Sequence, residues 1–265
     1  MTSQPPSLQG SASDAPAEGL VLAGVRRQYG SVVAVNDVYL TVPLNGRVGI
    51  VGPSGCGKST ILSVVSGLED PDDGSIHVLG GHTRAERLSR CAWMPQRDLL
   101  LPWRTVIGNI CLPLENRGIS KKDARKRVEP LFQRFGLGGF EDKRPTQLSG
   151  GMRQRASFLR TLVADKEVML LDEPFGALDS ITRGDIQMWL LRALDAEPRT
   201  VLMVTHDVEE AVLIADEVVV MSPRPGRVVA RIPSRLPGFS SRREAIAMPE
   251  FLAVRDAVMS ALEAA

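Results

Sequence analysis

The segment "GPSGCGKST", residues 52–60, constrains the fold of this chain more than any other part of the sequence. It matches the pattern G-x-x-x-x-G-K-S/T and stands between a short apolar run, "GRVGIVG", and the helically spaced "KSTILSVVSGL". Glycines let the backbone wrap closely enough for successive N–H groups to face phosphate oxygens, and the start of the following helix adds a favourable dipole. The segment therefore predicts a strand, a phosphate-binding loop and a helix that ends near Gly67.

The residues of this loop have distinct expected roles. Lys58 would reach the β- and γ-phosphates of a nucleotide, and the Ser59 hydroxyl would ligate Mg²⁺. A tight turn without a ligand is the alternative, but the strand–loop–helix context disfavours it. The expected phosphate contacts are Gly52, Pro53, Ser54, Gly55, Cys56, Gly57, Lys58, Ser59 and Thr60.

Three later apolar runs, "EVMLLDEP", "TVLMVTHD" and "EVVVMSP", are separated by helical stretches. Apolar runs without polar alternation are typical of parallel strands that are covered on both faces. The sequence therefore predicts an α/β domain with a mainly parallel sheet. Candidate catalytic side chains stand at the C-terminal ends of these runs, where open α/β sheets bind their ligands.

An acidic pair, Asp172 and Glu173, ends the first of these runs. Burying two adjacent carboxylates beside a core strand is costly unless a cation or a hydrogen-bond donor compensates, and a nucleotide-bound Mg²⁺ would do so. We expect Asp172 to steady the Mg²⁺ through water and Glu173 to polarise the attacking water as general base. Taken alone, "DEP" could equally form a turn, but the glycine-rich loop favours the functional interpretation.

His206 ends the next apolar run and is one of three histidines in the chain. A lone histidine at a strand end is more often structural than catalytic. Here its strand should lie beside the one that bears Glu173, which would aim the imidazole at a γ-phosphate and favours a catalytic role. Gln96 follows another apolar stretch and could sense the metal or the water, although an isolated glutamine would otherwise be interpreted as a surface loop residue.

A second glycine-containing segment, "LSGGMRQRASFLRTLV", begins at residue 148. Two glycines in a first turn weaken a helix by about 1 kcal/mol each relative to alanine, so they indicate that something approaches the backbone closely. The simplest arrangement is two copies of the chain placed head to tail, each giving this segment to the other's nucleotide. Ser149 is the expected N-cap, and the apolar stripe of the helix includes Met152, Ala156, Leu159 and Val163.

The composition narrows the possible functions. The 265 residues carry a net charge of +1, so no overall field indicates nucleic acid or an anionic membrane surface as a partner. The three cysteines lack CxxC spacing, which argues against a zinc site or a disulfide framework and favours a reducing cytoplasm. No apolar run approaches the roughly 20 residues of a membrane span, and the N-terminus lacks the regions of a signal peptide. Any membrane role would then come through a partner.

The remaining segments carry less chemistry. Residues 1–18 are rich in Ser, Pro, Ala and Gln, which predicts a disordered leader. Residues 97–162 have a mostly helical and polar pattern, in which Pro130 could kink or divide the piece "KKDARKRVEPLFQRFGL". The basic cluster at residues 121–127 is better explained as a solvated helix face than as a nucleic-acid patch, because no aromatic residues are interleaved with it.

The ordered set "GPSGCGKST", Gln96, "LSGGMRQ", "VMLLDEP", "ALD" at residues 177–179 and His206 resembles the ATP-binding subunits of ABC transporters. The resemblance covers residues 20–235. It implies a RecA-like P-loop NTPase core with a mainly parallel sheet, an N-terminal antiparallel β subdomain and an inserted α-helical subdomain at about residues 97–162.

The same resemblance implies ATP and Mg²⁺ as cofactors, with Tyr29 stacked on the adenine. Ser59, Gln96 and Asp172 would surround the metal, and the catalytic residues would be Lys58, Gln96, Glu173 and His206. ATP would be sandwiched in a head-to-tail dimer, in which Asp179 couples the two sites. The residues expected to act across the dimer interface are Ser149, Gly150, Gly151, Gln154 and Asp179.

Within the family, four stretches are similar to the ATPase subunits of bacterial nitrate, sulfonate and taurine importers: "LLPWRTVIGNICLPLENRG", "QLSGGMRQRASFLRTLV", "PFGALDSITR" and "MSPRPGRV". This implies an ATPase that powers import of a small solute, an anion such as nitrate, an alkanesulfonate or taurine, at the cytoplasmic face of the inner membrane. The implied partners are a second ATPase subunit, two transmembrane permease subunits and, indirectly, an extracytoplasmic solute-binding protein, with no nucleic acid. Residues 99–104 lie near the permease in that group, so Trp103 suits an interface anchor, although it could also pack on its own subdomain.

Residues 236–265 follow the ATPase core, and "MPEFLAVRDAVMSALEAA" predicts a terminal amphipathic helix that packs on its own domain. Two other functions fit parts of the pattern. A soluble ABC ATPase of DNA repair or translation shares the motifs but usually carries a long coiled-coil insertion or two cassettes. A small-molecule P-loop kinase would explain the first loop and Asp172 but not "LSGGMRQ" or His206.

Overall fold

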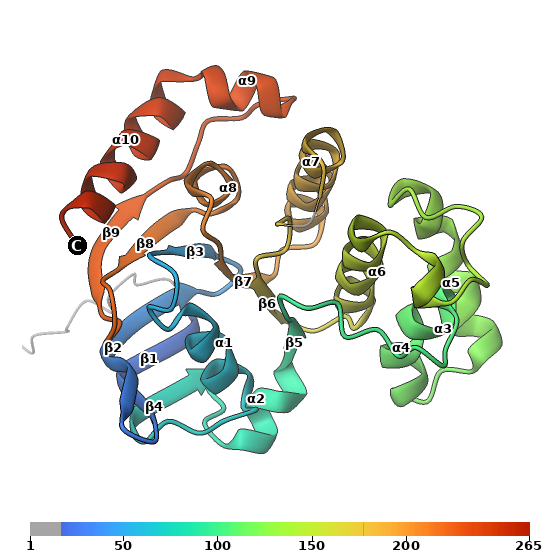
Figure 1. Cartoon of the computed structure of the whole chain (residues 1–265), viewed down its shortest axis with the longest axis horizontal. Helices are drawn as coiled ribbons and strands as arrows, with labels where there is room; N and C mark the ends of the chain where they lie inside the picture. The colour runs from blue at the N-terminus through green and yellow to red at the C-terminus, as the bar shows by residue number, and fades with distance from the viewer. Residues whose placement is uncertain (1–16, 177) are drawn as a thin grey trace, which may run out of the picture.

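Two β-sheets enclose helix α1 in the computed structural model, which describes residues 17–176 and 178–265 (Figure 1). The larger sheet has the strand order β5-β6-β7-β3-β8-β9, and the smaller one has the order β2-β1-β4. Apolar side chains of α1 and of both sheets form one buried cluster. The strands are β1 (Glu18–Tyr29), β2 (Val32–Pro43), β3 (Arg47–Val51), β4 (Asp73–Val78), β5 (Cys91–Met94), β6 (Val168–Asp172), β7 (Thr200–Val204), β8 (Glu217–Met221) and β9 (Val228–Pro233).

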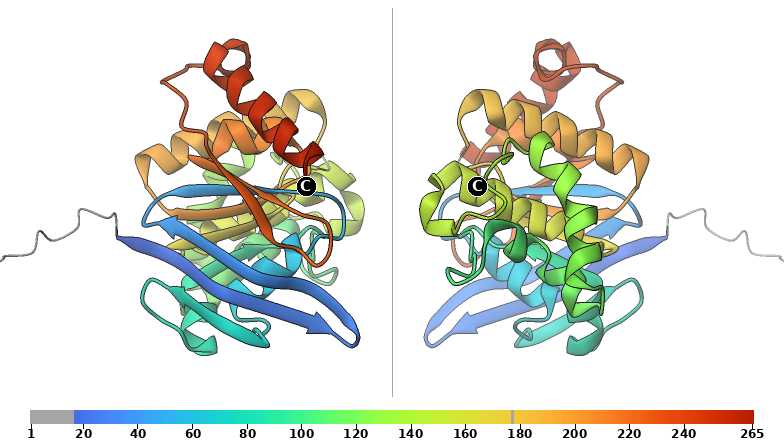
Figure 2. Two further views of the ribbon diagram at one scale, coloured as in Figure 1. Left: turned by 90° about the vertical axis from the view of Figure 1, so that its left-hand side faces the viewer. Right: turned by 90° about the vertical axis from the view of Figure 1, so that its right-hand side faces the viewer.

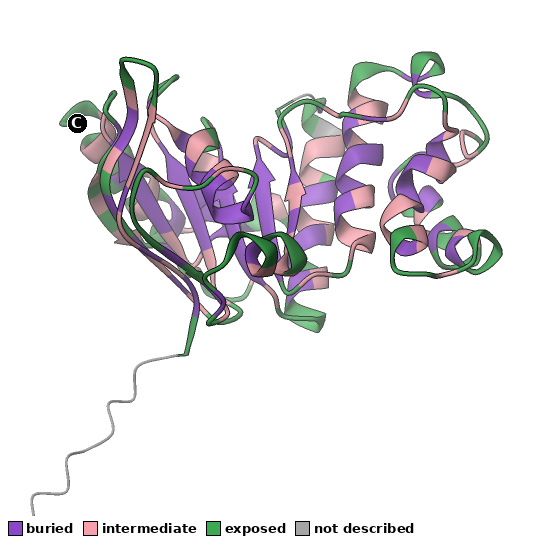
Figure 3. Cartoon of the chain, turned by 90° about the horizontal axis from the view of Figure 1, so that it is seen from below, coloured by how far each residue is buried: buried purple, intermediate pink, exposed green. Residues whose placement is uncertain are grey.

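The larger sheet is parallel except at one edge. Strands β5, β6, β7, β3 and β8 run parallel, and β9 pairs antiparallel with β8. Every residue of β6 and β7 is buried (Figure 3). Successive side chains enter different clusters, since Val168 and Leu170 face the cluster around α1 whereas Met169 and Leu171 face the one on the other side. The prediction of a mainly parallel sheet from uninterrupted apolar runs is therefore confirmed.

The smaller sheet is antiparallel throughout, with β1 paired to both β2 and β4. Its inner face is apolar, through residues such as Leu22 and Leu40, whereas Tyr39 on the outer face is 60% exposed. Strand β1 begins at Glu18, within the stretch expected to be a leader; residues 1–16 of that expected leader lie outside the described residues.

Helices cover the larger sheet and form a separate arm. The arm extends from the end of β5 to the start of β6 and stands away from the smaller sheet (Figure 1), and in the right-hand view of Figure 2 it lies in front of the sheets. The helices are α1 (Lys58–Ser66), α2 (Arg84–Arg90), α3 (Val106–Ile110), α4 (Leu112–Asn116), α5 (Lys121–Arg134), the 3₁₀ helix η1 (Pro145–Gln147), α6 (Gly150–Val163), α7 (Ser180–Ala196), α8 (Val208–Ile214), α9 (Arg242–Ala247) and α10 (Pro249–Glu263).

Helix α5 continues through Pro130 without division. Proline removes one backbone hydrogen bond, but Pro130 lies on the exposed side of the helix, where water can reach the carbonyl that is left free. Val128 and Phe132 on the other side are fully buried and hold the helix against the arm. The sequence pattern allowed for a break here, and packing of the apolar side explains why there is none.

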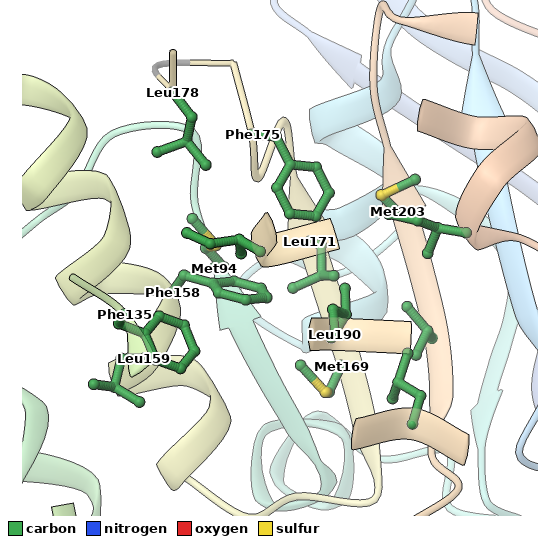
Figure 4. Close-up of a cluster of buried hydrophobic side chains, with 14 of the residues drawn as sticks. Met94, Phe135, Phe158, Leu159, Met169, Leu171, Phe175, Leu178, Leu190 and Met203 are labelled. Carbon is green, nitrogen blue, oxygen red and sulfur yellow. The ribbon is translucent and has the colours of Figure 1, made fainter. Parts of the chain in front are cut away.

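Phenylalanines connect the arm to the larger sheet (Figure 4). Phe158 of α6 packs against Phe175, which follows β6, with ring centroids 6.0 Å apart. Phe135, at the end of α5, packs against Trp189 of α7 at 4.7 Å. The helix that begins after Ser149 is thus in direct contact with the loop that follows the acidic pair.

The C-terminal helix α10 packs against α8, β8 and β9. Its residues Phe251 and Val258 are fully buried in the same cluster as the arm and the sheet. None of the helices in the described part of the chain combines the length and the hydropathy of a membrane span.

Candidate functional site

The glycine-rich loop connects β3 to α1, as the sequence pattern predicts. Gly57 has a φ of +102°, and a Cβ there would lie 2.4 Å from Val35 Cγ1 and 2.9 Å from the carbonyl oxygen of Ala34. Both the left-handed backbone and the close approach of β2 therefore require glycine. Lys58 is the first residue of α1, and its Nζ donates hydrogen bonds to the carbonyl oxygens of Gly52 at 2.7 Å and Pro53 at 3.0 Å. The loop thus surrounds a buried ammonium group.

Asp172 is the last residue of β6, and its side chain is buried next to the glycine-rich loop. Burial raises the pKa of Asp172 above its usual range, and the neighbouring charge of Glu173 acts in the same direction. A hydrogen bond with the Ser59 side chain and the charge of Lys58 oppose this rise. A buried carboxylate beside a hydroxyl is a group that a cation would stabilise.

Glu173 has a backbone conformation that is unusual for a residue with a side chain. Its φ is +48°, and its N–H donates to the carbonyl oxygen of Val204 at 2.9 Å. Two groups contact its carboxylate: Gln96 Nε2 donates to Oε2 at 2.8 Å, and His206 Nδ1 lies 3.3 Å from Oε1. The structure therefore brings three of the expected catalytic side chains together, and the expected adjacency of the strands that carry Glu173 and His206 is present in the pairing of β6 with β7.

A cavity of about 650 Å³ lies between the glycine-rich loop and these three side chains. Tyr29 stands at its rim with its hydroxyl donating to Glu69 Oε2 at 2.6 Å, and the Arg27 guanidinium lies 4.9 Å from its ring centroid. The cavity would hold an elongated polyanion with an aromatic group near Tyr29. Its lining residues are Tyr29, Val32, Ala34, Ser54, Gly55, Gly57, Lys58, Ser59, Thr60, Gln96, Glu173, His206 and Arg224.

Arg224 is a member of this site that the sequence pattern did not predict. Its Nε and Nη2 donate to the carbonyl oxygen of Gly55 at 3.1 and 2.9 Å. The two residues are 169 positions apart, and the surrounding "MSPRPGRV" carries no spacing that relates it to the loop. Val32 and Ala34 were likewise not expected in the site, because small apolar residues of a strand give no functional signal.

The second glycine segment has the predicted helix start but lies apart from the cavity. Ser149 caps α6, its Oγ accepting from Met152 N at 3.3 Å. Ser149 and Gly150 are exposed, and Gln154 is buried. A Cβ at Gly150 would meet the Arg153 Nη2 at 3.8 Å, an ordinary contact, so packing in the described chain does not require glycine there. Gly151, like Ser149, Gly150 and Gln154, is absent from the described lining of the cavity.

Asp179 and Trp103 lie at other parts of the surface. Asp179 caps α7, its Oδ1 accepting from Thr182 N at 3.0 Å, and this backbone hydrogen bond holds the pKa of Asp179 below its usual range. Ala177, the first residue of the "ALD" segment, lies outside the described residues. Trp103 is 68% exposed, so it does not pack on its own subdomain, which was one of the two interpretations of this residue.

Comparison with known proteins decides the family. The family model described as "ABC transporter" matches residues 35–176, a range that contains the glycine-rich loop, Gln96, the second glycine segment and the acidic pair. The chain belongs to the ABC transporter family. It is an ATP-binding subunit of that family and an ATPase.

Relatives within the ABC transporter family include import proteins. The chain is 38% identical over 245 residues to the taurine import ATP-binding protein TauB of Escherichia coli (strain K12), covering 91% of this chain and 96% of that protein. It is 45% identical over 193 residues to the formylaminopyrimidine import ATP-binding protein ThiZ of Halalkalibacterium halodurans, covering 72% of this chain and 74% of that protein.

Solved structures of ABC transporter cassettes have the same fold. The dimeric structure of MJ0796, a bacterial ABC transporter cassette, superposes with a TM-score of 0.76 at 30% identity, covering 83% of this chain and all of that one. A dimeric post-hydrolysis state of the same cassette, bound to ADP and Pi, gives a TM-score of 0.75 at 29% identity. Both structures carry titles that describe dimers, and the second describes a bound nucleotide.

Proposed function

We propose that this chain hydrolyses Mg-ATP in the cavity at the glycine-rich loop, with Glu173 as general base. The observation that supports this most directly is the Glu173 carboxylate, which contacts both Gln96 and His206. A carboxylate oriented by two neighbours can take a proton from a water molecule as that water attacks the γ-phosphorus, and ADP leaves. Lys58, already inside the loop, would neutralise charge on the β- and γ-phosphates once it exchanges the carbonyls of Gly52 and Pro53 for phosphate oxygens.

The residues near the phosphate positions fit a magnesium ion. Mg²⁺ prefers oxygen ligands and keeps several waters, so a hydroxyl, a carboxylate reached through water and phosphate oxygens form a suitable set. Ser59 is near enough to Asp172 to lower the pKa of that carboxyl, and Gln96 lines the same cavity as Ser59. The described residues contain no cluster of three or more His, Cys, Asp or Glu that could hold a metal alone, so the nucleotide would complete the set. When bound, Mg²⁺ would screen charge on the phosphates.

The second glycine segment would act on a neighbouring chain's nucleotide. Ser149, Gly150, Gly151 and Gln154 are on the arm, outside the described lining of their own chain's cavity, and the exposed Gly150 would leave its backbone N–H accessible to an anion. Two chains placed head to tail would enclose each ATP between the glycine-rich loop of one and Ser149 of the other. Asp179 would then lie at the interface. The dimeric cassettes among the similar structures support this arrangement.

The transport role would be ATP-driven import of a small anion, and the relatives named for import support it. Two permease subunits would bind the cassette dimer at the cytoplasmic face of the inner membrane, with Trp103 as an exposed anchor, and a solute-binding protein would deliver the solute on the other side. Nitrate, an alkanesulfonate and taurine fit this subunit equally, since solute specificity would lie in its partners.

The oligomeric state of the Glu173→Gln variant tests the central claim. Light scattering should show a monomer without nucleotide and a dimer with Mg-ATP, because the variant would bind ATP without consuming it. The same measurement with Ser149→Arg added should give a monomer in both conditions. A variant that binds ATP and remains monomeric would contradict the head-to-tail arrangement for the isolated chain.

A further inference from the structure

Arg183, on the first turn of α7, contacts three groups next to the candidate site. Its Nη2 donates to the carbonyl oxygen of Leu178 at 3.1 Å. Its Nη1 lies 3.5 Å from Asp207 Oδ2, and its Nε lies 3.8 Å from Glu210 Oε1. Leu178 belongs to the loop that follows Glu173, whereas Asp207 and Glu210 are at the start of α8. One side chain therefore joins the segment after β6 to the segment after β7.

Asp207 and Glu210, whose carboxyl groups face Arg183, also make the hydrogen bonds that hold the two residues next to His206 in the sequence. The Thr205 hydroxyl donates to Glu210 Oε2 at 2.8 Å and accepts from Asp207 N at 3.0 Å. Glu210 in turn donates its N–H to Asp207 Oδ1 at 3.2 Å. His206 itself has a side chain that is 65% exposed, so little packing orients its imidazole. Its position depends on these backbone anchors and on its contact with Glu173.

The Nε of Arg183 is buried, and its N–H has no hydrogen-bond acceptor among the described residues. A buried N–H without a partner is costly, and Glu210 Oε1 at 3.8 Å is beyond bonding distance by less than about 1 Å. A small displacement of the Arg183 guanidinium toward Glu210 Oε1 would close this bond and tighten the link between the two segments.

We propose that Arg183 is a positioning residue for hydrolysis, which holds the segment that carries His206 at a fixed position relative to the loop that follows Glu173. By doing so it keeps His206 Nδ1 close to Glu173 Oε1, now 3.3 Å apart. The arginine is suited to the task because its planar fork presents separate N–H groups to the Leu178 carbonyl oxygen and to the carboxyl groups of Asp207 and Glu210, whereas a lysine ammonium is a single compact charge. This inference rests on the proposed function, since it assigns Arg183 a task in hydrolysis at Glu173.

A second arginine provides a matched control. Arg242 of α9 bridges the same two helices, with Nε donating to Gln187 Oε1 of α7 at 3.2 Å and Nη2 donating to Glu209 Oε2 of α8 at 3.1 Å. Neither of these partners is adjacent to His206 in the sequence. Arg242→Ala therefore removes a comparable bridge without touching the anchors of the imidazole.

The test combines hydrolysis kinetics with the ring signal of His206. The chain has three histidines, so an NMR spectrum of the imidazole C–H groups is simple, and His206→Asn identifies the signal of interest. Arg183→Ala should lower kcat at least about tenfold, change the ATP dissociation constant less than about twofold, and shift the His206 signal at fixed pH. Arg242→Ala should keep kcat within about twofold of the wild type and leave that signal unmoved.

Several outcomes overturn the proposal. A folded Arg183→Ala variant with wild-type kcat, or one that loses kcat while the His206 signal stays in place, removes the positioning role. An equal loss of kcat in Arg242→Ala also removes it, because the effect would then belong to helix packing in general.

If Arg183→Ala does not fold, Arg183→Lys replaces it and should lower kcat by about threefold or more with a shifted His206 signal. Wild-type kcat and an unmoved signal in that variant count against the proposal. A wild-type chain that hydrolyses no ATP in this assay refutes the proposed function instead, and the NMR comparison, which needs no turnover, still judges Arg183.

Discussion

Gln96 and Glu173 share a hydrogen bond of 2.8 Å although 77 positions separate them in the sequence. The bond exists because β5 and β6 are neighbouring parallel strands in which Met94 pairs with Leu171, and Gln96 and Glu173 each come two residues after one member of that pair. Sheet register thus places an amide against a carboxylate at the edge where the glycine-rich loop also lies.

Removing the charge of Glu173 should separate binding from turnover. We expect Glu173→Gln to lower kcat by about 100-fold or more, because a general base typically contributes at least that factor, while ATP affinity stays within about threefold. Release of inorganic phosphate and binding of a fluorescent ATP analogue measure the two quantities. Glu250→Gln, on the exposed first turn of α10, is the control and should leave both unchanged. Undiminished hydrolysis in Glu173→Gln would exclude it as the base.

A mixture of two inactive variants should recover activity if Ser149 serves a neighbour's nucleotide. Lys58→Ala and Ser149→Arg each damage both sites of a homodimer, whereas their heterodimer contains one intact site. Random mixing of equal amounts would restore about a quarter of the wild-type sites, since half of the dimers are mixed and each has one site in two. Recovery should need mixing before nucleotide is added. A verified heterodimer without any recovered hydrolysis would place Ser149 in its own chain's site or outside the reaction.

Substitution of Gly57 should reveal the close approach of β2 to the loop. Both Gly57 and Gly80 have a positive φ, which disfavours a side chain. A Cβ at Gly57 would also lie 2.4 Å from Val35 Cγ1 and 2.9 Å from the Ala34 carbonyl oxygen, whereas a Cβ at Gly80 would have no atom within 4 Å. Gly80→Ala should therefore cost about 1–2 kcal/mol of unfolding free energy from backbone strain alone. Gly57→Ala should cost more than that and abolish ATP binding, as urea denaturation and nucleotide titration would show. Equal losses in the two variants would mean that the loop yields to the added methyl group.

The buried Glu210 should make stability depend on pH. Burial is the main cause that raises its pKa to about 7, with the Asp207 charge adding to the rise, while the Thr205 hydrogen bond and the charges of Arg183 and His206 oppose it. The folded chain then binds a proton that the unfolded chain releases near 4.5, so this stabilisation is complete below pH 4.5 and is lost as the pH rises through about 7.

Glu210→Gln, which keeps a neutral side chain of the same shape, should remove that dependence. Its free energy of unfolding relative to the wild type should increase between pH 5 and 8 by about 2–3 kcal/mol, from the size of the pKa difference. Denaturation curves at several pH values measure this. A constant difference for Glu210→Gln would show that the Glu210 carboxylate is not penalised by burial.

Trp103 should matter for assembly and not for the nucleotide. Trp103→Ser should leave ATP affinity of the purified chain within about twofold and should reduce recovery of the chain with membrane vesicles that contain its permease by about tenfold, as expected for a buried aromatic anchor. Leu88→Ser, an exposed apolar residue on α2, is the matched control. Equal recovery of the Trp103 variant and the wild type would remove this residue from the interface.

Local patterns in the sequence predicted the parts of the structure that depend on nearby residues. The helix after the glycine-rich loop ends at Ser66 with Gly67 as its cap, and Ser149 caps α6, because both signals act within a few positions of the residue concerned. The buried runs of β6 and β7 were equally clear, since a fully covered strand needs apolar side chains on both faces.

Contacts between segments that are far apart in the sequence have no local sequence pattern that predicts them. Nothing around Arg224 indicates that its guanidinium reaches Gly55, and nothing around Arg183 indicates Glu210, because an exposed-looking arginine in a polar stretch is compatible with many partners. The left-handed backbone of Glu173 was also unpredictable, since glutamate rarely adopts it and the hydrogen bond to Val204 that accompanies it comes from the neighbouring strand.

The side-by-side arrangement of β5, β6 and β7 has a consequence for how such a chain can change over time. Gln96, Glu173 and His206 each follow one of these strands by one or two residues, so an insertion or deletion inside a strand would turn the side chain to the wrong face. The segments between the strands carry no such restriction. The whole helical arm is inserted between Gln96 and Glu173, and it could lengthen, shorten or acquire a new docking surface while the three groups that we propose for hydrolysis kept their places.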